Sequence, residues 1–139
     1  MPLPFDLVCI IDDDPIYVNL VTRIVKLKNF SRSLLVFQNG QEALEYFKTL
    51  NITDSDTKIP QLILLDINMP IMDGWEFLEE FSKFSSTFMN KLQLYVVSSS
   101  INPADIRKAK SVDFVTDYIT KPLHVDSINS IFDTPAETL

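Results

Sequence analysis

Cysteine, histidine and glycine are scarce in this chain, and each scarcity excludes something. One cysteine, one histidine and two glycines occur among 139 residues. A single cysteine cannot form an internal disulfide, which fits a reducing compartment, and the chain lacks the cysteine and histidine ligands typical of zinc sites. Cys9 lies inside the apolar run LVCII, so we interpret it as a small core residue and not as a reactive thiol. The glycines, Gly40 and Gly74, each precede a segment of helical periodicity.

Long apolar runs and an excess of positive charge are also missing. No run approaches the roughly 20 residues that cross a bilayer, and the start of the chain lacks the basic region of a secretory signal, so we expect a cytoplasmic protein without membrane contact. The net charge of −7 opposes binding to a phosphate backbone, so we expect no nucleic-acid partner. The length predicts one domain over residues 1–139, with its core at residues 5–133 and a short tail at 134–139.

Apolar runs of strand length alternate with segments of helical periodicity along the whole chain. We expect strands at 7–11, 33–37, 62–66 and 92–97 and a short one near 117–119. The polar stretch 51–58 has no periodicity and is predicted to be a surface loop. Five such βα units predict an α/β fold with a parallel sheet.

Helix signals follow each predicted strand. Asp14 before Pro15 predicts an N-cap and a first helical turn, and Asn39 and Asn102 begin later helices in the same way. Apolar residues at helical spacing are Ile16, Leu20, Ile24 and Leu27 with Val21 and Val25 beside them, then Ala43, Leu44 and Phe47, then Trp75, Leu78 and Phe81 as a buried face, and finally Val125, Ile128 and Phe132. Pro135 should stop the brief last helix.

Polar and charged residues follow four of the predicted strands. Strand one runs into Asp12, Asp13 and Asp14, strand three into Asp66, strand four into Ser98–Ser100, and strand five leads to Lys121. Open α/β sheets bind ligands at the carboxyl ends of their strands, so these groups are expected to converge on one edge.

Three carboxylates at one edge need compensation. If Asp12, Asp13 and Asp66 were ionised about 5 Å apart, each pair would repel by roughly 3 kcal/mol at an effective dielectric near 20. Such a site must take up a proton or a cation. Oxygen-only ligands in small number favour Mg²⁺, with Mn²⁺ as a possible substitute. A cation beside a carboxylate nucleophile predicts phosphoryl transfer onto Asp66, with Lys121 and the Ser98 hydroxyl on other phosphoryl oxygens.

Four segments then match a known family. IIDDDP, LLDINMPIMDGWEFL, VVSSS and YITKPL, in that order, resemble the receiver domain of two-component response regulators, and the chain resembles a standalone, CheY-like member. The resemblance implies a three-layer, flavodoxin-like, doubly wound sheet of five parallel strands in the order 2-1-3-4-5. It implies Asp66 as phosphoacceptor, Asp12 and Asp13 as the acidic pair at the metal, and Asn68 as a metal ligand through its backbone carbonyl.

The same resemblance assigns the remaining site positions. Ser98 would be the hydroxyl of the switch position, Ser99 the small residue that leaves room for phosphate, and Tyr118 the aromatic residue whose rotamer follows the switch. Lys121 would contact the phosphoryl group, and Pro122 would be structural, after a peptide bond that is commonly cis. We hypothesise that Asn68 and Ser100 flank the attacking water and tune the lifetime of the phosphorylated state.

The implied role is a signalling module and not an enzyme, beyond its own phosphorylation and dephosphorylation. Its donor would be a sensor histidine kinase or a phosphotransfer protein, its target a downstream protein, and its state a monomer or a weak phosphorylation-dependent dimer. Two alternatives stay open. One is a magnesium phosphohydrolase of the haloacid dehalogenase type, although Ile16 stands where that pattern needs threonine. The other is a receiver that has lost phosphorylation and only docks.

Overall fold

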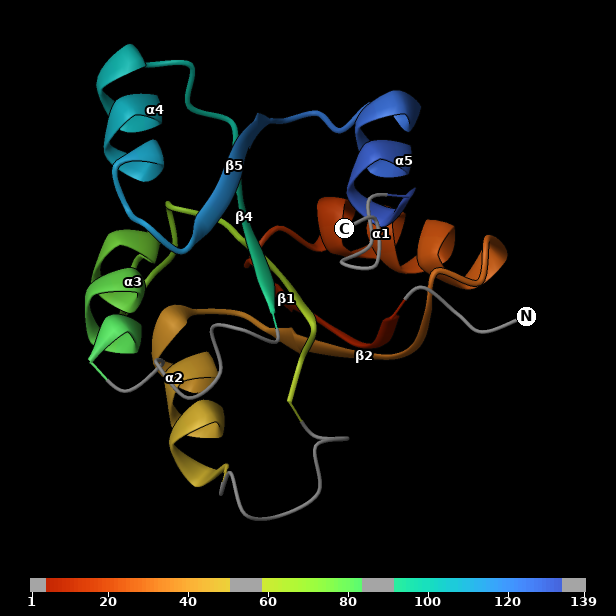
Figure 1. Cartoon of the computed structure of the whole chain (residues 1–139), viewed down its shortest axis with the longest axis horizontal. Helices are drawn as coiled ribbons and strands as arrows, with labels where there is room; N and C mark the ends of the chain where they lie inside the picture. Colours follow the sequence, from red (N-terminus) through yellow and green to blue (C-terminus); the bar gives the residue numbers. More distant parts are fainter. Residues whose placement is uncertain (1–4, 51–58, 84–91, 134–139) are drawn as a thin grey trace.

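The computed structural model describes residues 5–50, 59–83 and 92–133 (Figure 1). Within them strands and helices alternate. The strands are β1 (Phe5–Ile11), β2 (Ser31–Phe37), β3 (Leu62–Leu65), β4 (Gln93–Ser98) and β5 (Val115–Thr120). The helices are α1 (Pro15–Leu27), α2 (Gly40–Thr49), α3 (Gly74–Ser82), α4 (Pro103–Lys110) and α5 (Val125–Asp133). The loop expected at 51–58, the tail at 134–139 and Pro135 lie outside the described residues.

The strands form one parallel sheet in the order β2-β1-β3-β4-β5, which confirms the expected order and direction. The chain moves from β1 outward to β2 and then returns to the other side of β1 for β3. Ligands bind at such a reversal of strand order. Ile11 pairs with Leu65, so the residues that follow these two strands leave the sheet side by side.

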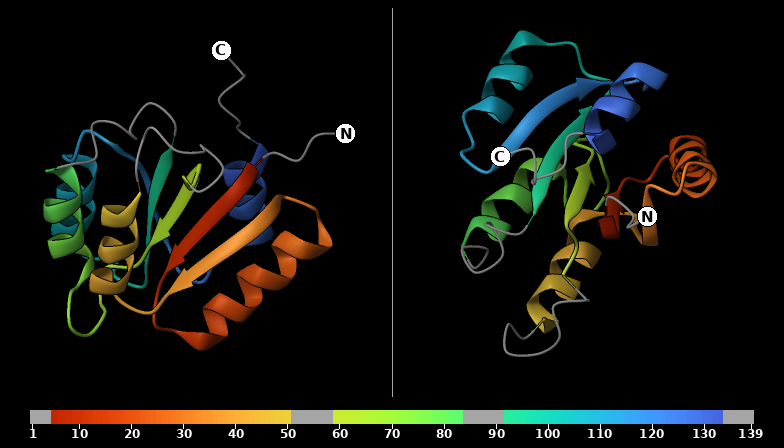
Figure 2. Two further views of the ribbon diagram at one scale, coloured as in Figure 1. Left: turned by 90° about the horizontal axis from the view of Figure 1, so that it is seen from below. Right: turned by 45° about the vertical axis from the view of Figure 1, so that its right-hand side comes forward.

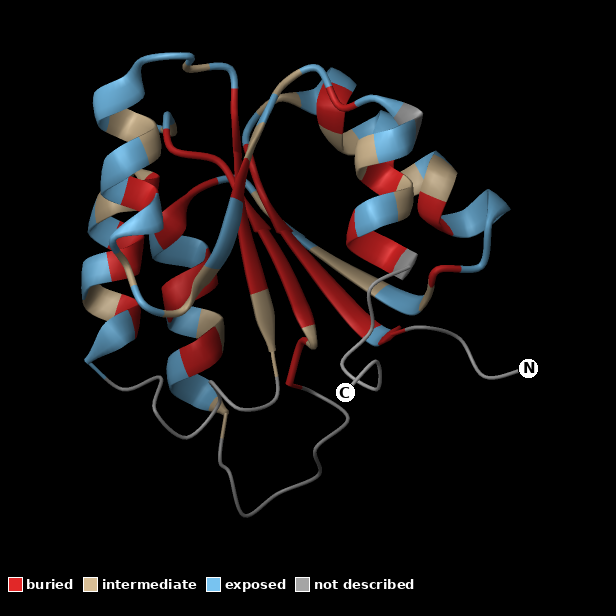
Figure 3. Cartoon of the chain, turned by 45° about the horizontal axis from the view of Figure 1, so that its top comes forward, coloured by how far each residue is buried: buried red, intermediate tan, exposed pale blue. Residues whose placement is uncertain are grey.

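Helices cover both faces of the sheet (Figures 2 and 3). Helices α1 and α5 pack on one face, and α2, α3 and α4 pack on the other. Strand β1 contributes to both cores, because Val8 and Ile10 face the first pair of helices while Cys9 and Ile11 face the other three. Cys9 is fully buried, as predicted, and burial raises the pKa of its thiol. Within the described residues, no helix is long and apolar enough to cross a bilayer.

Two helices bury a different set of residues from the ones that periodicity names first. In α1 the buried row is Tyr17, Val21 and Val25, whereas Ile16 and Leu27 are 80% and 81% exposed. Helix α1 carries two adjacent apolar rows, and periodicity alone does not select between them. The turn before the helix selects, because the Asp14 backbone N–H donates to Asp12 Oδ1 and the Asp14 carboxylate caps α1.

The buried face predicted for α3 was wrong at one position. Leu78 and Phe81 are buried, but Trp75 is only partly buried, and Phe77 fills the core instead. A capping box at Asp73 and Glu76 fixes where the helix begins. Residues 77, 78 and 81 then form the row that faces the sheet, and residue 75 stands at its margin.

Candidate functional site

Two buried acids and one exposed acid meet where β1 and β3 end. The Asp66 backbone N–H donates to the Ile11 carbonyl at 2.9 Å, so the pairing of β1 with β3 continues to Asp66. Asp12 is 1% exposed and Asp66 is 7% exposed. One carboxylate oxygen from each of Asp12, Asp13 and Asp66 lies within 4.8 Å of the others. The structure therefore brings the three predicted acids together.

The ammonium of Lys121 reaches this acid cluster from the end of β5. Its Nζ lies 2.8 Å from Asp12 Oδ2 and 3.7 Å from Asp66 Oδ2, and its side chain is 12% exposed. The Lys121 backbone N–H donates to the Ser98 carbonyl at 2.8 Å, and the peptide bond from Lys121 to Pro122 is cis. One positive charge therefore offsets part of the charge of the three acids.

The oxygens that remain fit a hard divalent cation. Asp12 Oδ2 is buried, and apart from the nearby ammonium it accepts no hydrogen bond of favourable angle from the described residues. Backbone N–H groups of Ile67 and Asn68 donate to the Asp66 carboxylate and orient it. Carboxylate oxygens with free lone pairs are the ligands that Mg²⁺ and Mn²⁺ take in proteins. Asn68 itself is exposed, two residues beyond Asp66.

Burial disfavours the ionised forms of Asp12 and Asp66 when no metal is bound. It raises the pKa of Asp12 from 3.8 to about 6, against the lowering effect of hydrogen bonds from Lys121 and the Asp14 backbone. Burial also raises the pKa of Asp66, against the attraction of Lys121. A cation at the cluster would favour the ionised form of both, so protons and metal compete for this site.

This competition predicts how stability depends on pH. In EDTA, folded Asp12 binds its proton more tightly than unfolded Asp12, so the free energy of unfolding should fall as pH rises from about 4 to about 6. Saturating Mg²⁺ should flatten or reverse that slope. Thermal melts across this window, with and without metal, measure it. Asp12→Asn is the control that should lose much of the fall, and a metal-free protein that gains stability through the window would contradict the prediction.

The three serines after β4 lie in different environments. Ser98 is fully buried, and its hydroxyl oxygen accepts from the Ser100 backbone N–H at 3.1 Å, whereas Ser99 is exposed. The Ser100 hydroxyl donates to Asp105 in α4 at 2.6 Å. Tyr118 is buried, and its hydroxyl donates to the Ser100 carbonyl at 2.7 Å. The loop after Ser98 is therefore tied to both α4 and β5.

Sequence reasoning missed two residues in this arrangement. Asp105 holds the Ser100 hydroxyl, and the ring of Tyr17 lies beneath the Lys121 ammonium. Asp105 stands in the first turn of a helix, where an acid is ordinary, and Tyr17 belongs to an apolar row, where an aromatic residue is ordinary. Neither position carries a sequence signal that separates it from packing or capping.

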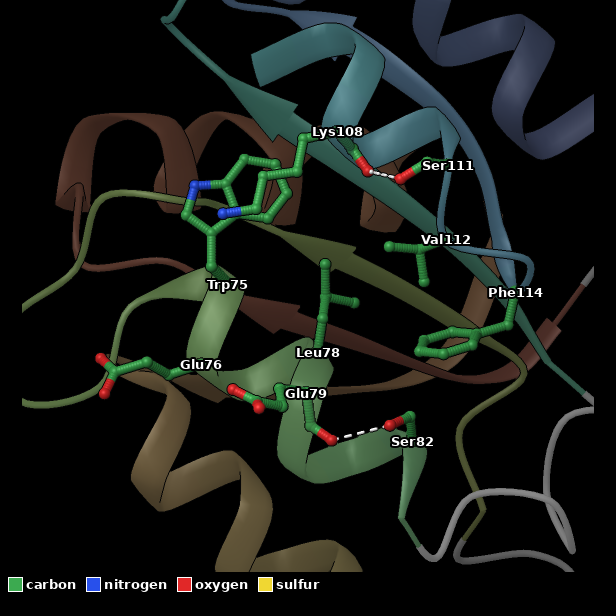
Figure 4. A pocket seen from close by; sticks show the side chains of 9 residues that line it. All are labelled: Trp75, Glu76, Leu78, Glu79, Ser82, Lys108, Ser111, Val112 and Phe114. Carbon is green, nitrogen blue, oxygen red and sulfur yellow. Dashed lines mark hydrogen bonds between the residues drawn. The ribbon is translucent and has the colours of Figure 1, made fainter. Parts of the chain in front are cut away.

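A hollow of about 380 Å³ lies elsewhere, between α3 and α4 (Figure 4). The ammonium of Lys108 lies 4.4 Å from the centre of the Trp75 ring at its rim, and Leu78, Val112 and Phe114 supply apolar lining. None of its lining residues belongs to the acid cluster. The cluster, and not this hollow, carries the groups that support chemistry.

Comparisons with known proteins agree with one another on the family. The family model of the response regulator receiver domain matches residues 8–133. The sensor histidine kinase CheAY of Helicobacter pylori is 37% identical over 106 residues, which make up 76% of this chain and 12% of that protein. A two-component response regulator from Cytophaga hutchinsonii is 30% identical with a TM-score of 0.76, over 92% of this chain and 94% of that one. The Mn²⁺-bound form of response regulator Rcp1 is 22% identical with a TM-score of 0.72, over 91% and 88%.

These matches differ in how much of each relative they cover. The chain spans about an eighth of the kinase and nearly all of the Cytophaga structure. Receiver domains work in two-component signalling, where they interact with histidine kinases or phosphotransfer proteins and bind Mg²⁺ or Mn²⁺ at an acidic pocket, and the buried acid cluster described above fits such a pocket. The chain belongs to the response regulator receiver domain family.

Proposed function

We propose that Asp66 accepts a phosphoryl group, in a metal-dependent reaction, from a sensor histidine kinase or a phosphotransfer protein. The observation that carries this proposal is the environment of the Asp66 carboxylate. Asp66 lies among two further acids within 4.8 Å and an ammonium at 3.7 Å, at the reversal of strand order. No other described group of three acids, cysteines or histidines could hold a metal ion.

The transfer step uses groups that the fold already holds in place. A carboxylate oxygen of Asp66 forms a bond to phosphorus while the bond from phosphorus to the donor imidazole nitrogen breaks, and its electron pair stays on that nitrogen. Backbone donors from Ile67 and Asn68 orient the carboxylate for attack. Lys121 lies close enough to pair with a phosphoryl oxygen, and Ser98 supplies a hydroxyl from the neighbouring strand end.

Asp12, Asp13 and Asp66 would hold Mg²⁺, with the backbone carbonyl of Asn68 as a further ligand, and Mn²⁺ could replace it. The cation supplies charge that offsets the incoming phosphoryl oxygens. Formally, the cation at +2 and Lys121 at +1 balance three carboxylates. The buried Asp12 Oδ2, which has no neighbour to accept from among the described residues except the Lys121 ammonium, and the Mn²⁺-bound form of Rcp1 support this assignment.

Signal output would follow from movement in the loop after β4. A phosphoryl group that draws the Ser98 hydroxyl toward it would also move Ser100, whose backbone N–H donates to that hydroxyl. Ser100 is hydrogen-bonded in turn to the Tyr118 hydroxyl and to Asp105. The message would then reach a downstream protein through α4 and β5. We propose a cytoplasmic protein, monomeric or weakly dimeric on phosphorylation, that contacts neither nucleic acid nor membrane.

The direct test is incubation with a small phosphodonor such as phosphoramidate or acetyl phosphate. Intact mass should show one phosphoryl increment in Mg²⁺ and none in EDTA. A protein that gains no increment would be a docking module only. Steady turnover of a phosphatase substrate would indicate the phosphohydrolase alternative instead.

We further propose that Asn68 and Ser100 set the lifetime of the phosphorylated state, since they stand two residues beyond Asp66 and Ser98. Asn68→Ala and Ser100→Ala should each change the decay rate of the acyl phosphate by about threefold or more, a shift of about 0.7 kcal/mol. Asp105→Ala removes the acceptor of the Ser100 hydroxyl and should also change the decay. Loss of radiolabel over time measures the rates, and unchanged decay in Asn68→Ala and Ser100→Ala would end the idea.

A further inference from the structure

An aromatic ring supports the ammonium of Lys121 from below. The Nζ atom lies 4.3 Å from the centre of the Tyr17 ring, which belongs to the first turn of α1. Tyr17 is 6% exposed, so the contact lies away from bulk water. A cation over an aromatic face is attracted to the ring, and the attraction strengthens as water is removed.

Lys121 needs such support because it comes from the far side of the sheet edge. It follows β5, and β4 and β3 lie between β5 and β1, which delivers Asp12. A lysine side chain loses considerable rotamer freedom when it is held across such a span. Holding the Lys121 side chain in one conformation therefore requires contacts between its backbone and the acid cluster.

The acids alone do not define one position for the ammonium. Carboxylate oxygens of Asp12, Asp66 and Asp14 lie 2.8, 3.7 and 4.0 Å from Nζ, and all three attract it. Attraction to several neighbours draws the charge into the cluster without choosing among them. A ring on one side limits the ammonium to the side that faces Asp12 and Asp66.

The hydroxyl of Tyr17 is not what this position uses. It is buried, and it has no hydrogen-bond partner among the described residues. Buried tyrosine hydroxyls usually have a partner, because leaving one unpaired is unfavourable. What the position uses is then the ring itself, whose face meets Lys121 and which belongs to the same core cluster as Val21 and Val25.

We propose that Tyr17 is a positioning residue that holds the Lys121 ammonium ready beside Asp66 before the phosphoryl group arrives. The proposal rests on the proposed role of Asp66 as phosphoacceptor. Tyr17 acts through Lys121 and touches neither phosphoryl group nor metal. Its contribution therefore depends on the ring, and phenylalanine should replace it.

The matched variants are Tyr17→Leu, which removes the ring, and Tyr17→Phe, which keeps it. With phosphoramidate and Mg²⁺, Tyr17→Leu should be phosphorylated about tenfold more slowly, whereas Tyr17→Phe should stay within about twofold of the wild type. Tyr17→Phe should also melt about 3 °C higher, because it removes the unpaired hydroxyl. Tyr17→Met is a second ring-free variant in case Tyr17→Leu folds poorly.

Calorimetric titration with Mg²⁺ alone separates positioning from damage to the pocket. An ammonium that is no longer held at Asp12 competes less with the cation, so Tyr17→Leu should bind Mg²⁺ as tightly as the wild type or more tightly. A collapsed pocket would instead bind Mg²⁺ more weakly. In a Lys121→Met background, Tyr17→Leu should slow phosphorylation no further, since the group through which it acts is gone.

Three results would overturn the proposal. These are a wild-type rate in both ring-free variants, weaker Mg²⁺ binding in both, or a full additional loss in the Lys121→Met background. A wild-type protein that takes up no phosphoryl group would instead refute the proposed function itself. The two failures are therefore distinguishable in one set of assays.

Discussion

Asp66→Asn should take up no phosphoryl group under conditions in which the wild type is fully converted. An amide oxygen is a poor nucleophile, and a side chain without a carboxylate cannot form an acyl phosphate. The change is nearly isosteric, and the amide oxygen can still accept the Ile67 backbone N–H at the position where Oδ1 accepts it now. The fold should therefore survive while the reaction is lost.

The same variant should be more stable than the wild type when no metal is present. Burial raises the pKa of Asp66, which means that its surroundings disfavour the charged form on balance. A neutral side chain removes that cost and the repulsion from Asp13. Mg²⁺ should then stabilise Asp66→Asn less than it stabilises the wild type, because one of three acidic ligands has become neutral.

Intact mass after incubation with phosphoramidate and thermal melts in EDTA and Mg²⁺ measure both effects. The matched control is Asp113→Asn, which neutralises an exposed acid outside the cluster and should behave as the wild type does. A phosphoryl increment that persists in Asp66→Asn would place the phosphoacceptor elsewhere.

The acid cluster was predictable because it depends on few facts. Parallel strands end at one edge, and an acid directly after a buried run must leave the sheet there. Asp12 and Asp66 follow Ile11 and Leu65, which are paired residues of adjacent strands. One residue of error in a strand end would not have separated them, because both strands would still deliver their acids to the same edge.

The rotation of α1 and the support of Lys121 were not predictable in the same way. Ile16 and Tyr17 each belong to a row of largely apolar residues at helical spacing, so the sequence alone does not show which row is buried. The choice depends on a turn held by Asp12 and Asp14 and on packing against α5 across the sheet face. Contacts of this kind exist only after the elements have assembled.

The Ser100 side chain gives a third example. Its spacing from Ser98 predicts a place beside Asp66, and in the structure its backbone lies beside Ser98, since its N–H donates to the Ser98 hydroxyl oxygen. Its hydroxyl nevertheless donates to Asp105, five residues later in the chain. Spacing along a chain constrains where a backbone passes, but the rotamer of a short polar side chain follows from whichever partner is nearest.

Gly74→Ala should be among the most destabilising single substitutions at this edge of the sheet. Gly74 has no positive φ angle, so the reason lies in space and not in backbone conformation. A Cβ atom at residue 74 would overlap the Asp66 carbonyl oxygen and lie 2.8 Å from the Ile67 Cα. Both obstacles are backbone atoms, and the Gly74 N–H already donates to the Ile67 carbonyl at 2.7 Å.

Relief would require the start of α3 to move away from the residues that directly follow β3. We expect a loss of about 3 kcal/mol or more in the free energy of unfolding, measured by urea denaturation at neutral pH. We also expect slower phosphorylation of the protein that remains folded, because the displaced backbone carries Asp66 and its N–H donors. The two effects should appear together, since one clash causes both.

Gly40→Ala is the matched control, because it also lies at the start of a helix. Its Cβ would lie 3.0 Å from the Met72 side chain, the Met72 carbonyl oxygen and the Phe77 Cβ, so no atom is overlapped there as the Asp66 carbonyl oxygen is at residue 74. We expect a cost of about 1 kcal/mol there and a phosphorylation rate near that of the wild type. Equal costs at the two glycines would contradict the argument, because the close approach of α3 to the Asp66 backbone would then have no energetic consequence.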